Sequence, residues 1–102
     1  MPFNRYARRV DANHAEIVVA LRAACYSVLS LAAMGRGVPD LLVARDGRAW
    51  LVEIKKRNAR GRTSAGAARS EREQAVWAAS WRGCPVVQVS TVDEALRAVG
   101  AA

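Results

Sequence analysis

The hydrophobic and polar positions of the chain change their period from one segment to the next. Between residues 13 and 24 apolar side chains recur every three or four positions, the spacing of an amphipathic helix (Ile17, Val18, Leu21, Ala24). We expect this helix to begin near Asp11 or Asn13, because Asn13 and Glu16 have the spacing of a capping box. Residues 26–31, YSVLSL, mix aromatic, β-branched and polar positions and predict a first strand.

Two short apolar runs, residues 41–44 and 49–52, follow on either side of Asp46-Gly47 and predict a β-hairpin. Charged residues interrupt it at one end. Asp40 stands at the start of the first strand, and Glu53 and Lys55 stand at the end of the second. Residues i and i+2 of a strand share a face, and the start of one hairpin strand pairs with the end of the other. We therefore expect Asp40 and Glu53 to lie side by side, with Lys55 next to them.

The second half of the chain predicts a loop, a helix, a strand and a short helix. Residues 55–72 hold seven basic residues with two glycines, a composition typical of a flexible loop. Ser70 and Glu73 have capping-box spacing, and the following helix ends at Gly83. It carries Gln74, Trp77 and Trp81 on one face, where the tryptophans are expected in the core and base stacking is the other role open to them. Residues 85–90 predict the last strand, and Thr91 caps a helix through Val99.

The predicted order is helix, three strands, helix, strand, helix, which is an α/β fold. The 102 residues suffice for one domain, with residues 1–10 as a basic arm and residues 11–102 as the domain. A hydrophobic share of 52% excludes disorder. We see no apolar segment that fits a signal peptide or a membrane span. Cys25 and Cys84 lack metal-site spacing, so we expect reduced core residues and a cytoplasmic protein.

The net positive charge and the two adjacent carboxylates indicate two different binding partners. A net charge of +7 favours a polyanion, most simply nucleic acid, although a basic surface that only maintains solubility is the alternative. Two adjacent carboxylates on an apolar sheet are costly unless they are paired or bind a cation, and oxygen ligands suit Mg²⁺ or Mn²⁺. An ordinary Asp–Lys ion pair on a surface hairpin is the other reading. His14 is the single histidine, so a zinc site is not expected.

The combination of Gly37, Pro39, Asp40, Glu53, Lys55, Gln74 and Trp77 resembles the P-D-(x)n-(D/E)-x-K nuclease superfamily, and within it the VRR-NUC group. The resemblance implies a restriction-endonuclease-like αβββαβα core, with a central mixed four-stranded sheet flanked by helices. The loop between Lys55 and Gln74 is longer than is usual in that group.

The resemblance also implies roles for individual residues. Asp40, Glu53 and the backbone carbonyl of Ile54 hold Mg²⁺ or Mn²⁺, and Lys55 orients or helps to deprotonate the attacking water. Gln74 holds that water or a phosphate oxygen. Glu16 is either the acidic residue of the first helix, directed at a second ion or its water, or only part of the capping box. The expected DNA contacts are basic residues before the hairpin and in the loop after it, where a solvated linker is the alternative: Arg36, Lys56, Arg57, Arg60, Arg62 and Arg69.

The function that the resemblance implies is a Mg²⁺- or Mn²⁺-dependent DNA endonuclease, selective for branched or junction DNA or acting by nicking. Small members of the superfamily include Holliday-junction resolvases, often phage-encoded, so a bacterial or phage-infected cell is the expected setting. Members that cut two strands usually act as homodimers, which makes a homodimer one expected assembly. The alternatives are a basic DNA-binding module without catalysis, a nuclease domain that a partner protein targets, and a small structural protein. An RNA substrate also stays open.

Overall fold

The computed structural model describes residues 12–55 and 65–101, with side chains for residues 13–55 and 71–101. The predicted order of helices and strands is observed, with one added 3-10 turn, η2. The elements are α1 (Ala12–Ala23), β1 (Ser27–Ser30), η2 (Ala32–Met34), β2 (Leu41–Arg45), β3 (Arg48–Ile54), α2 (Ala65–Ser80), β4 (Val86–Val89) and α3 (Val92–Ala98). The basic arm, residues 1–10, and the loop residues Lys56, Arg57, Arg60 and Arg62 lie outside the described part of the chain, as does the side chain of Arg69.

The four strands form one mixed sheet in the order β1-β2-β3-β4. β1, β2 and β3 are antiparallel neighbours, and β4 runs parallel to β3. In the hairpin Leu41 pairs with Val52, so Asp40 directly precedes this pair and Glu53 directly follows it. The parallel pair β3–β4 requires a crossover, which α2 supplies. The chain therefore has the mixed α/β architecture that its pattern predicts.

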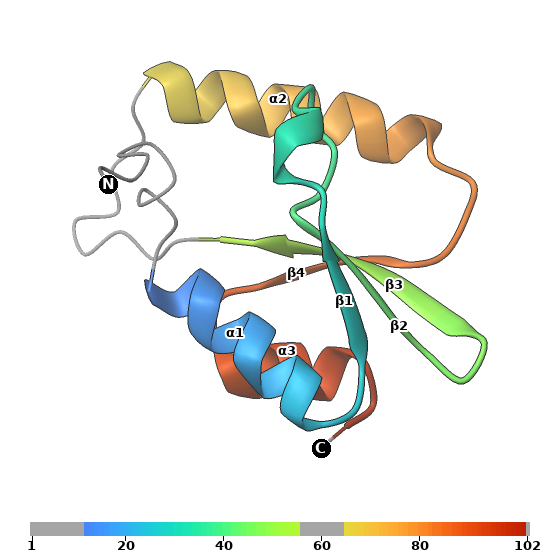
Figure 1. Cartoon of the computed structure of the whole chain (residues 1–102). Helices are drawn as coiled ribbons and strands as arrows, with labels where there is room; N and C mark the ends of the chain where they lie inside the picture. Colours follow the sequence, from blue (N-terminus) through green and yellow to red (C-terminus); the bar gives the residue numbers. More distant parts are fainter. Residues whose placement is uncertain (1–11, 56–64, 102) are drawn as a thin grey trace, which may run out of the picture.

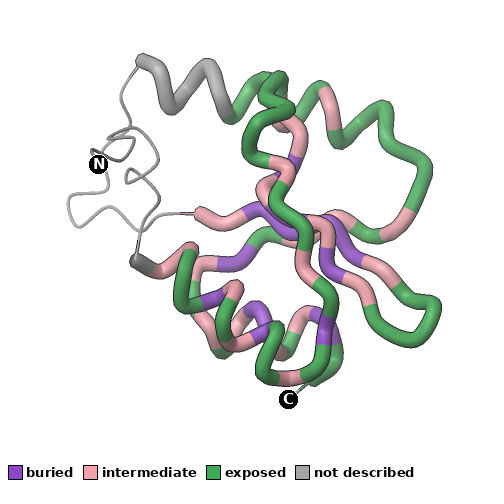
Figure 2. The backbone as a smooth tube through the Cα atoms, in the orientation of Figure 1, coloured by how far each residue is buried: buried purple, intermediate pink, exposed green. Residues whose placement is uncertain are grey.

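The helices cover the two faces of the sheet unequally. α1 and α3 lie together on one face, and α2 lies on the other (Figure 1). The largest fully buried side chains come from α1, β2, β3 and the residue after α3 (Ile17, Leu21, Leu41, Val43, Val52, Val99). Within residues 71–80 of α2 no side chain is buried (Figure 2). The apolar core is therefore on the α1/α3 face of the sheet, and α2 packs less closely against the opposite face.

Two expected helix boundaries are wrong. α2 already begins at Ala65, so Ser70 lies inside the helix and does not cap it. α2 also ends at Ser80, three residues before Gly83. In α1, Asn13 lies inside the helix and donates its side-chain amide to the carbonyl of Ser90, at 3.2 Å. Thr91 is confirmed as a cap, because its hydroxyl accepts the backbone N–H of Glu94 at 3.1 Å.

Two expected core residues are exposed. Cys25 lies at the surface with a left-handed backbone (φ 72°) just after α1. Trp81 is 40% exposed because its indole stacks on Trp77 and donates its N–H to the carbonyl of Cys84. Trp81 thus closes the end of α2 instead of entering the core. Among the described helices, none has both the length and the apolar character needed to cross a membrane.

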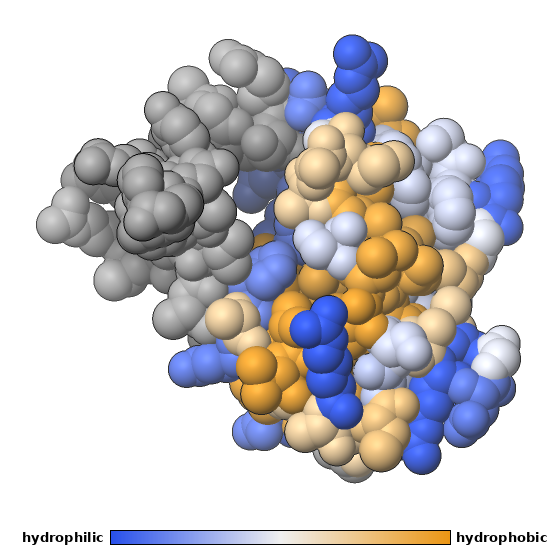
Figure 3. All heavy atoms as spheres, viewed as in Figure 1, coloured by the Kyte–Doolittle hydropathy of each residue, from blue (hydrophilic) through white to orange (hydrophobic). Residues whose placement is uncertain are grey.

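The edge strand β1 presents apolar atoms at the surface. Leu29 and Met34, from β1 and η2, are 58% and 64% exposed. In the space-filling view, apolar residues gather on the face where β1 and η2 lie (Figure 3). The chain from η2 then turns beside α2 and reaches Asp40 directly before β2, at the charged end of the hairpin.

Candidate metal centre

Asp40 is fixed by both its main chain and its side chain. Its backbone carbonyl accepts the N–H of Leu31 at 2.7 Å, which ties it to the end of β1. Its carboxylate oxygen Oδ2 accepts the N–H of Ile54 at 2.8 Å, across the mouth of the hairpin. The carboxylate therefore replaces the next rung of the β2–β3 ladder, and its position is set by the strand register.

Glu53 is the one buried charged side chain among the described residues, at 7% exposure. Burial, and then the negative charge of Asp40, raise the pKa of Glu53 to about 7, while the Lys55 charge and the Gln74 hydrogen bond act in the opposite direction. The two carboxylates are thus close enough to repel each other at a position that is partly shielded from solvent. A cation between them would relieve that repulsion, which is what a metal site of two acidic ligands requires.

Gln74 links the two ends of the charged cluster. Its amide N–H donates to Glu53 Oε2 at 2.7 Å, and its amide oxygen accepts from Lys55 Nζ at 2.6 Å. A carboxylate only accepts and an ammonium only donates, so the two partners fix which way the amide points. Lys55 is held in addition by its backbone N–H, which donates to the carbonyl of Val89 at 2.7 Å. Gln74 therefore sets the spacing of Lys55 and Glu53 without an ion pair between them.

Gly37 brings α2 into contact with the turn before β2. Its backbone has φ +85°, and a Cβ there would collide with the carbonyl of Glu73 and lie 2.9 Å from the backbone nitrogen of Gln74. Only glycine fits both the conformation and the close approach. The contact places the turn of α2 that carries Gln74 at the end of the hairpin where Asp40 and Glu53 lie.

Two hollows meet at this cluster. The first, about 280 Å³, lies under α2 and includes Lys55, Trp77 and the β4 residues Val86 and Gln88 in its lining. The second, about 220 Å³, includes Asp40, Glu73 and Arg36. We call them the lysine hollow and the aspartate hollow. Glu53 and Gln74 line both, so they form the wall between the two.

The oxygen atoms at this wall suit a hard divalent cation. Within the described residues no three His, Cys, Asp or Glu side chains gather as a metal site. The available protein donors are therefore the two carboxylates and a backbone carbonyl. The N–H groups of Leu51 and Lys55 point to β4, and that of Ile54 points to Asp40. Since a strand residue directs its N–H and C=O to the same side, the Ile54 carbonyl also faces the Asp40 side.

The structure brings together most of the predicted site but not Glu16. Asp40, Glu53, Lys55 and Gln74 are joined as described, and Arg36 lines the aspartate hollow. Glu16 is exposed on α1 and lines neither of these two hollows, because its neighbour Ile17 takes the inward position with 0% exposure. Glu73 is an acidic residue that sequence reasoning assigned only to a cap. Its position directly before Gln74 was the available signal for its place in the aspartate hollow.

Comparisons of the chain with protein families, with curated proteins and with solved structures find no match. The function is therefore inferred from the geometry of the site itself.

Proposed function

We propose that the protein is a metal-dependent phosphodiesterase that cleaves DNA, built on the restriction-endonuclease-like core of the VRR-NUC group. The observation that carries the proposal is the buried Glu53 carboxylate, placed next to Asp40 and linked through Gln74 to Lys55. Two carboxylates and an ammonium at the open end of a hairpin are the groups that phosphodiester hydrolysis with Mg²⁺ or Mn²⁺ needs.

Each residue has a separable role in this proposal. Asp40, the carboxylate of Glu53 and the carbonyl of Ile54 would hold Mg²⁺ or Mn²⁺. The bound ion would supply charge stabilisation at the phosphate and increase the acidity of water. Gln74 donates to Glu53 Oε2, and a backbone hydrogen bond from Asp40 also favours the charged form of this carboxylate.

Lys55 acts on the reacting phosphate or water. Its ammonium has three donors, and Gln74 accepts one of them. The others can hold the attacking water or a phosphate oxygen in the lysine hollow, where positive charge stabilises the additional negative charge of the transition state. Gln74 keeps Lys55 in place and bridges its ammonium to the Glu53 carboxylate.

A DNA-binding module without catalysis would explain the net charge of +7 equally well. It would not explain the acidic cluster. A buried carboxylate beside a second carboxylate costs free energy and repels phosphate unless a cation lies between them. The proposed cleavage is selective for branched or junction DNA, or acts by nicking.

The direct test is cleavage of a panel of labelled DNAs: single strand, duplex, flap, splayed arm and four-way junction, with Mg²⁺, Mn²⁺ or EDTA. We expect cleavage that needs the metal and is lost in Glu53→Gln, while Asp46→Asn at the other end of the hairpin cuts like the parent. Cleavage by Glu53→Gln at the parent rate would refute the proposal. Loss of cleavage in Glu16→Gln would add this exposed carboxylate to the site.

A further inference from the structure

A third hollow lies beside the candidate metal centre, between the turn after η2 and α2. It has a volume of about 760 Å³, within the range of roughly 300–1,000 Å³ of ligand sites. We call it the α2 groove. Its lining comes from one side of α2 and from the turn before β2: Arg36, Arg72, Glu73, Val76, Trp77 and Ser80.

The apolar part of the α2 groove is exposed and held in place. Val76 is 71% exposed on α2, beside Trp77. Trp77 is half-buried, and its ring stacks on Trp81 with centroids 4.9 Å apart and planes inclined by 18°. The stacking restrains the indole, so the groove has a preformed aromatic and aliphatic surface.

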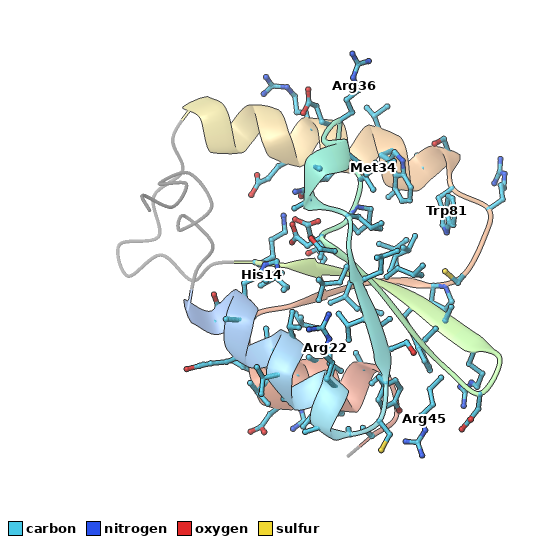
Figure 4. All side chains as sticks on the ribbon, viewed as in Figure 1. His14, Arg22, Met34, Arg36, Arg45 and Trp81 are labelled. Carbon is cyan, nitrogen blue, oxygen red and sulfur yellow. The ribbon has the colours of Figure 1, made fainter. Side chains whose placement is uncertain are left out.

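The basic part of the α2 groove is formed by two guanidinium groups from different elements. Arg72 lies on α2, one turn before Val76. Arg36 lies in the turn after η2, where its backbone is left-handed (φ 57°), and its side chain projects from the η2 side beside α2 (Figure 4). Against these two cations stands one carboxylate, Glu73. The groove therefore combines apolar surface with a net positive charge.

The α2 groove adjoins the aspartate hollow. Arg36 and Glu73 line both hollows. A nucleic-acid strand that extends from Asp40 and Glu53 would therefore pass Arg36 and reach Val76 and Trp77. Arg36 can contact a phosphate at this boundary, since a guanidinium matches phosphate oxygens with two parallel donors. In a nucleic acid each phosphate is joined to a sugar that carries a base. With the phosphate at Arg36, the neighbouring sugar and base would lie at the apolar surface formed by Val76 and Trp77.

We propose that the α2 groove binds an unpaired nucleotide adjacent to the phosphodiester that is cut. Arg36 and Arg72 hold its phosphates, and Val76 with Trp77 contacts its base. Double-stranded DNA presents phosphates and sugars to a surface hollow and keeps its base faces stacked inside, whereas a base outside a duplex can place its face on the apolar surface between the two arginines. The assignment of a cut site depends on the proposed nuclease function, whereas binding in the groove does not.

Binding without metal separates the two claims. The probes are a labelled single-stranded oligothymidylate and an oligomer of the same length with abasic units at every position, titrated with the protein in EDTA and followed by anisotropy. We expect the abasic oligomer to bind about tenfold more weakly, since stacking of a base on an aromatic side chain is lost. Equal affinity of the two oligomers would overturn the proposal.

Variants locate the effect. Val76→Glu places a charge on an exposed helix position, and we expect it to reduce the tenfold difference between the oligomers to less than twofold. Val19→Glu is the matched control, because Val19 is 67% exposed on α1 at the opposite face of the sheet. If both variants keep the tenfold difference, or if both lose it, the groove is not the base site.

Cleavage assays then distinguish this proposal from the nuclease proposal. If the parent cuts DNA but Val76→Glu cuts a splayed arm and a continuous duplex in the parent ratio, the groove proposal fails and the nuclease proposal stands. If base discrimination is present in EDTA and no metal-dependent cleavage occurs on any substrate, the groove proposal stands and the nuclease proposal fails.

Discussion

Glu53 is the residue on which the proposed chemistry depends. Its burial under α2 and its closeness to Asp40 raise its pKa to about 7 from an ordinary value of 4.5. A carboxyl group that is protonated near neutral pH is a poor metal ligand, and a metal ion competes with the proton for it. The same residue therefore connects metal affinity, stability and pH.

The free energy of unfolding without metal should fall as pH rises from about 4.5 to about 7. The folded state keeps its proton on Glu53 through this window while the unfolded state loses it, so raising the pH favours unfolding, by up to about 3 kcal/mol. Denaturant titrations at pH 5 and pH 8 measure it. Glu53→Gln should remove most of the difference. An identical pH dependence in the parent and this variant would show that Glu53 titrates normally.

Gln74 is predicted to act on catalysis through its two neighbours. Gln74→Ala removes both the bond to Glu53 and the bond from Lys55, so we expect cleavage to slow about 10–100-fold, the usual effect of losing a group that orients ligands. DNA affinity should change less than twofold. Asn13→Ala is the control, because it removes another half-buried amide, one that donates to the carbonyl of Ser90. The measurement is the single-turnover cleavage rate of Gln74→Ala and Asn13→Ala, each compared with the parent.

The hairpin and α2 build the site at the scale of secondary structure. The hairpin was predictable because the apolar runs, the Asp46-Gly47 turn and the charged end are all within 16 residues. The start of α2 was not, since Gly61 and Gly66 on either side of Thr63 and Ser64 favour a loop, although Ser64 directly before Ala65 is a residue type that favours helix N-caps. The exposure of Trp81 was also not predictable, because it results from a contact with the carbonyl of Cys84 after the helix has ended.

The close contact between α2 and the turn at Gly37 gives a sharp test. Gly37→Ala introduces a Cβ that collides with the Glu73 carbonyl, so α2 must move and Gln74 with it. We expect cleavage to fall at least tenfold and Trp fluorescence to shift. Gly35→Ala is the matched control: its backbone is also left-handed (φ +66°), but a Cβ there meets no atom within 4 Å. Similar activity losses in both variants would attribute the effect to backbone strain alone.

The whole chain combines a basic surface with an acidic centre. In the proposed function the net charge of +7 would give the chain affinity for DNA, and the two carboxylates would bind the cation. The sequence was sufficient for the mixed α/β order and for the group formed by Asp40, Glu53, Lys55 and Gln74. It was insufficient for Glu16, which only the family resemblance directs at the metal site and which the structure places on the exposed side of α1. It also gave no sign of the α2 groove, which depends on how α2 meets the turn at Arg36.

The dependence of DNA affinity on salt concentration tests the role of the net charge. DNA affinity, measured with Glu53→Gln so that nothing is cut, should fall steeply with salt because bound counterions are released from phosphates. For four phosphate contacts the loss is about 100-fold between 50 and 200 mM salt. An affinity that changes less than twofold over this range would show that the positive charge of the chain does not contact DNA.

The central claim is that Asp40 and Glu53 form one site for a divalent cation. Calorimetric titration with Mn²⁺ at pH 8 tests it without any assumption about substrate. We expect one ion per chain for the parent and for Asp46→Asn, and no binding for Glu53→Gln or Asp40→Asn when circular dichroism shows that both are folded. Mn²⁺ binding by Glu53→Gln with the parent affinity, or no binding by the parent, would contradict the account.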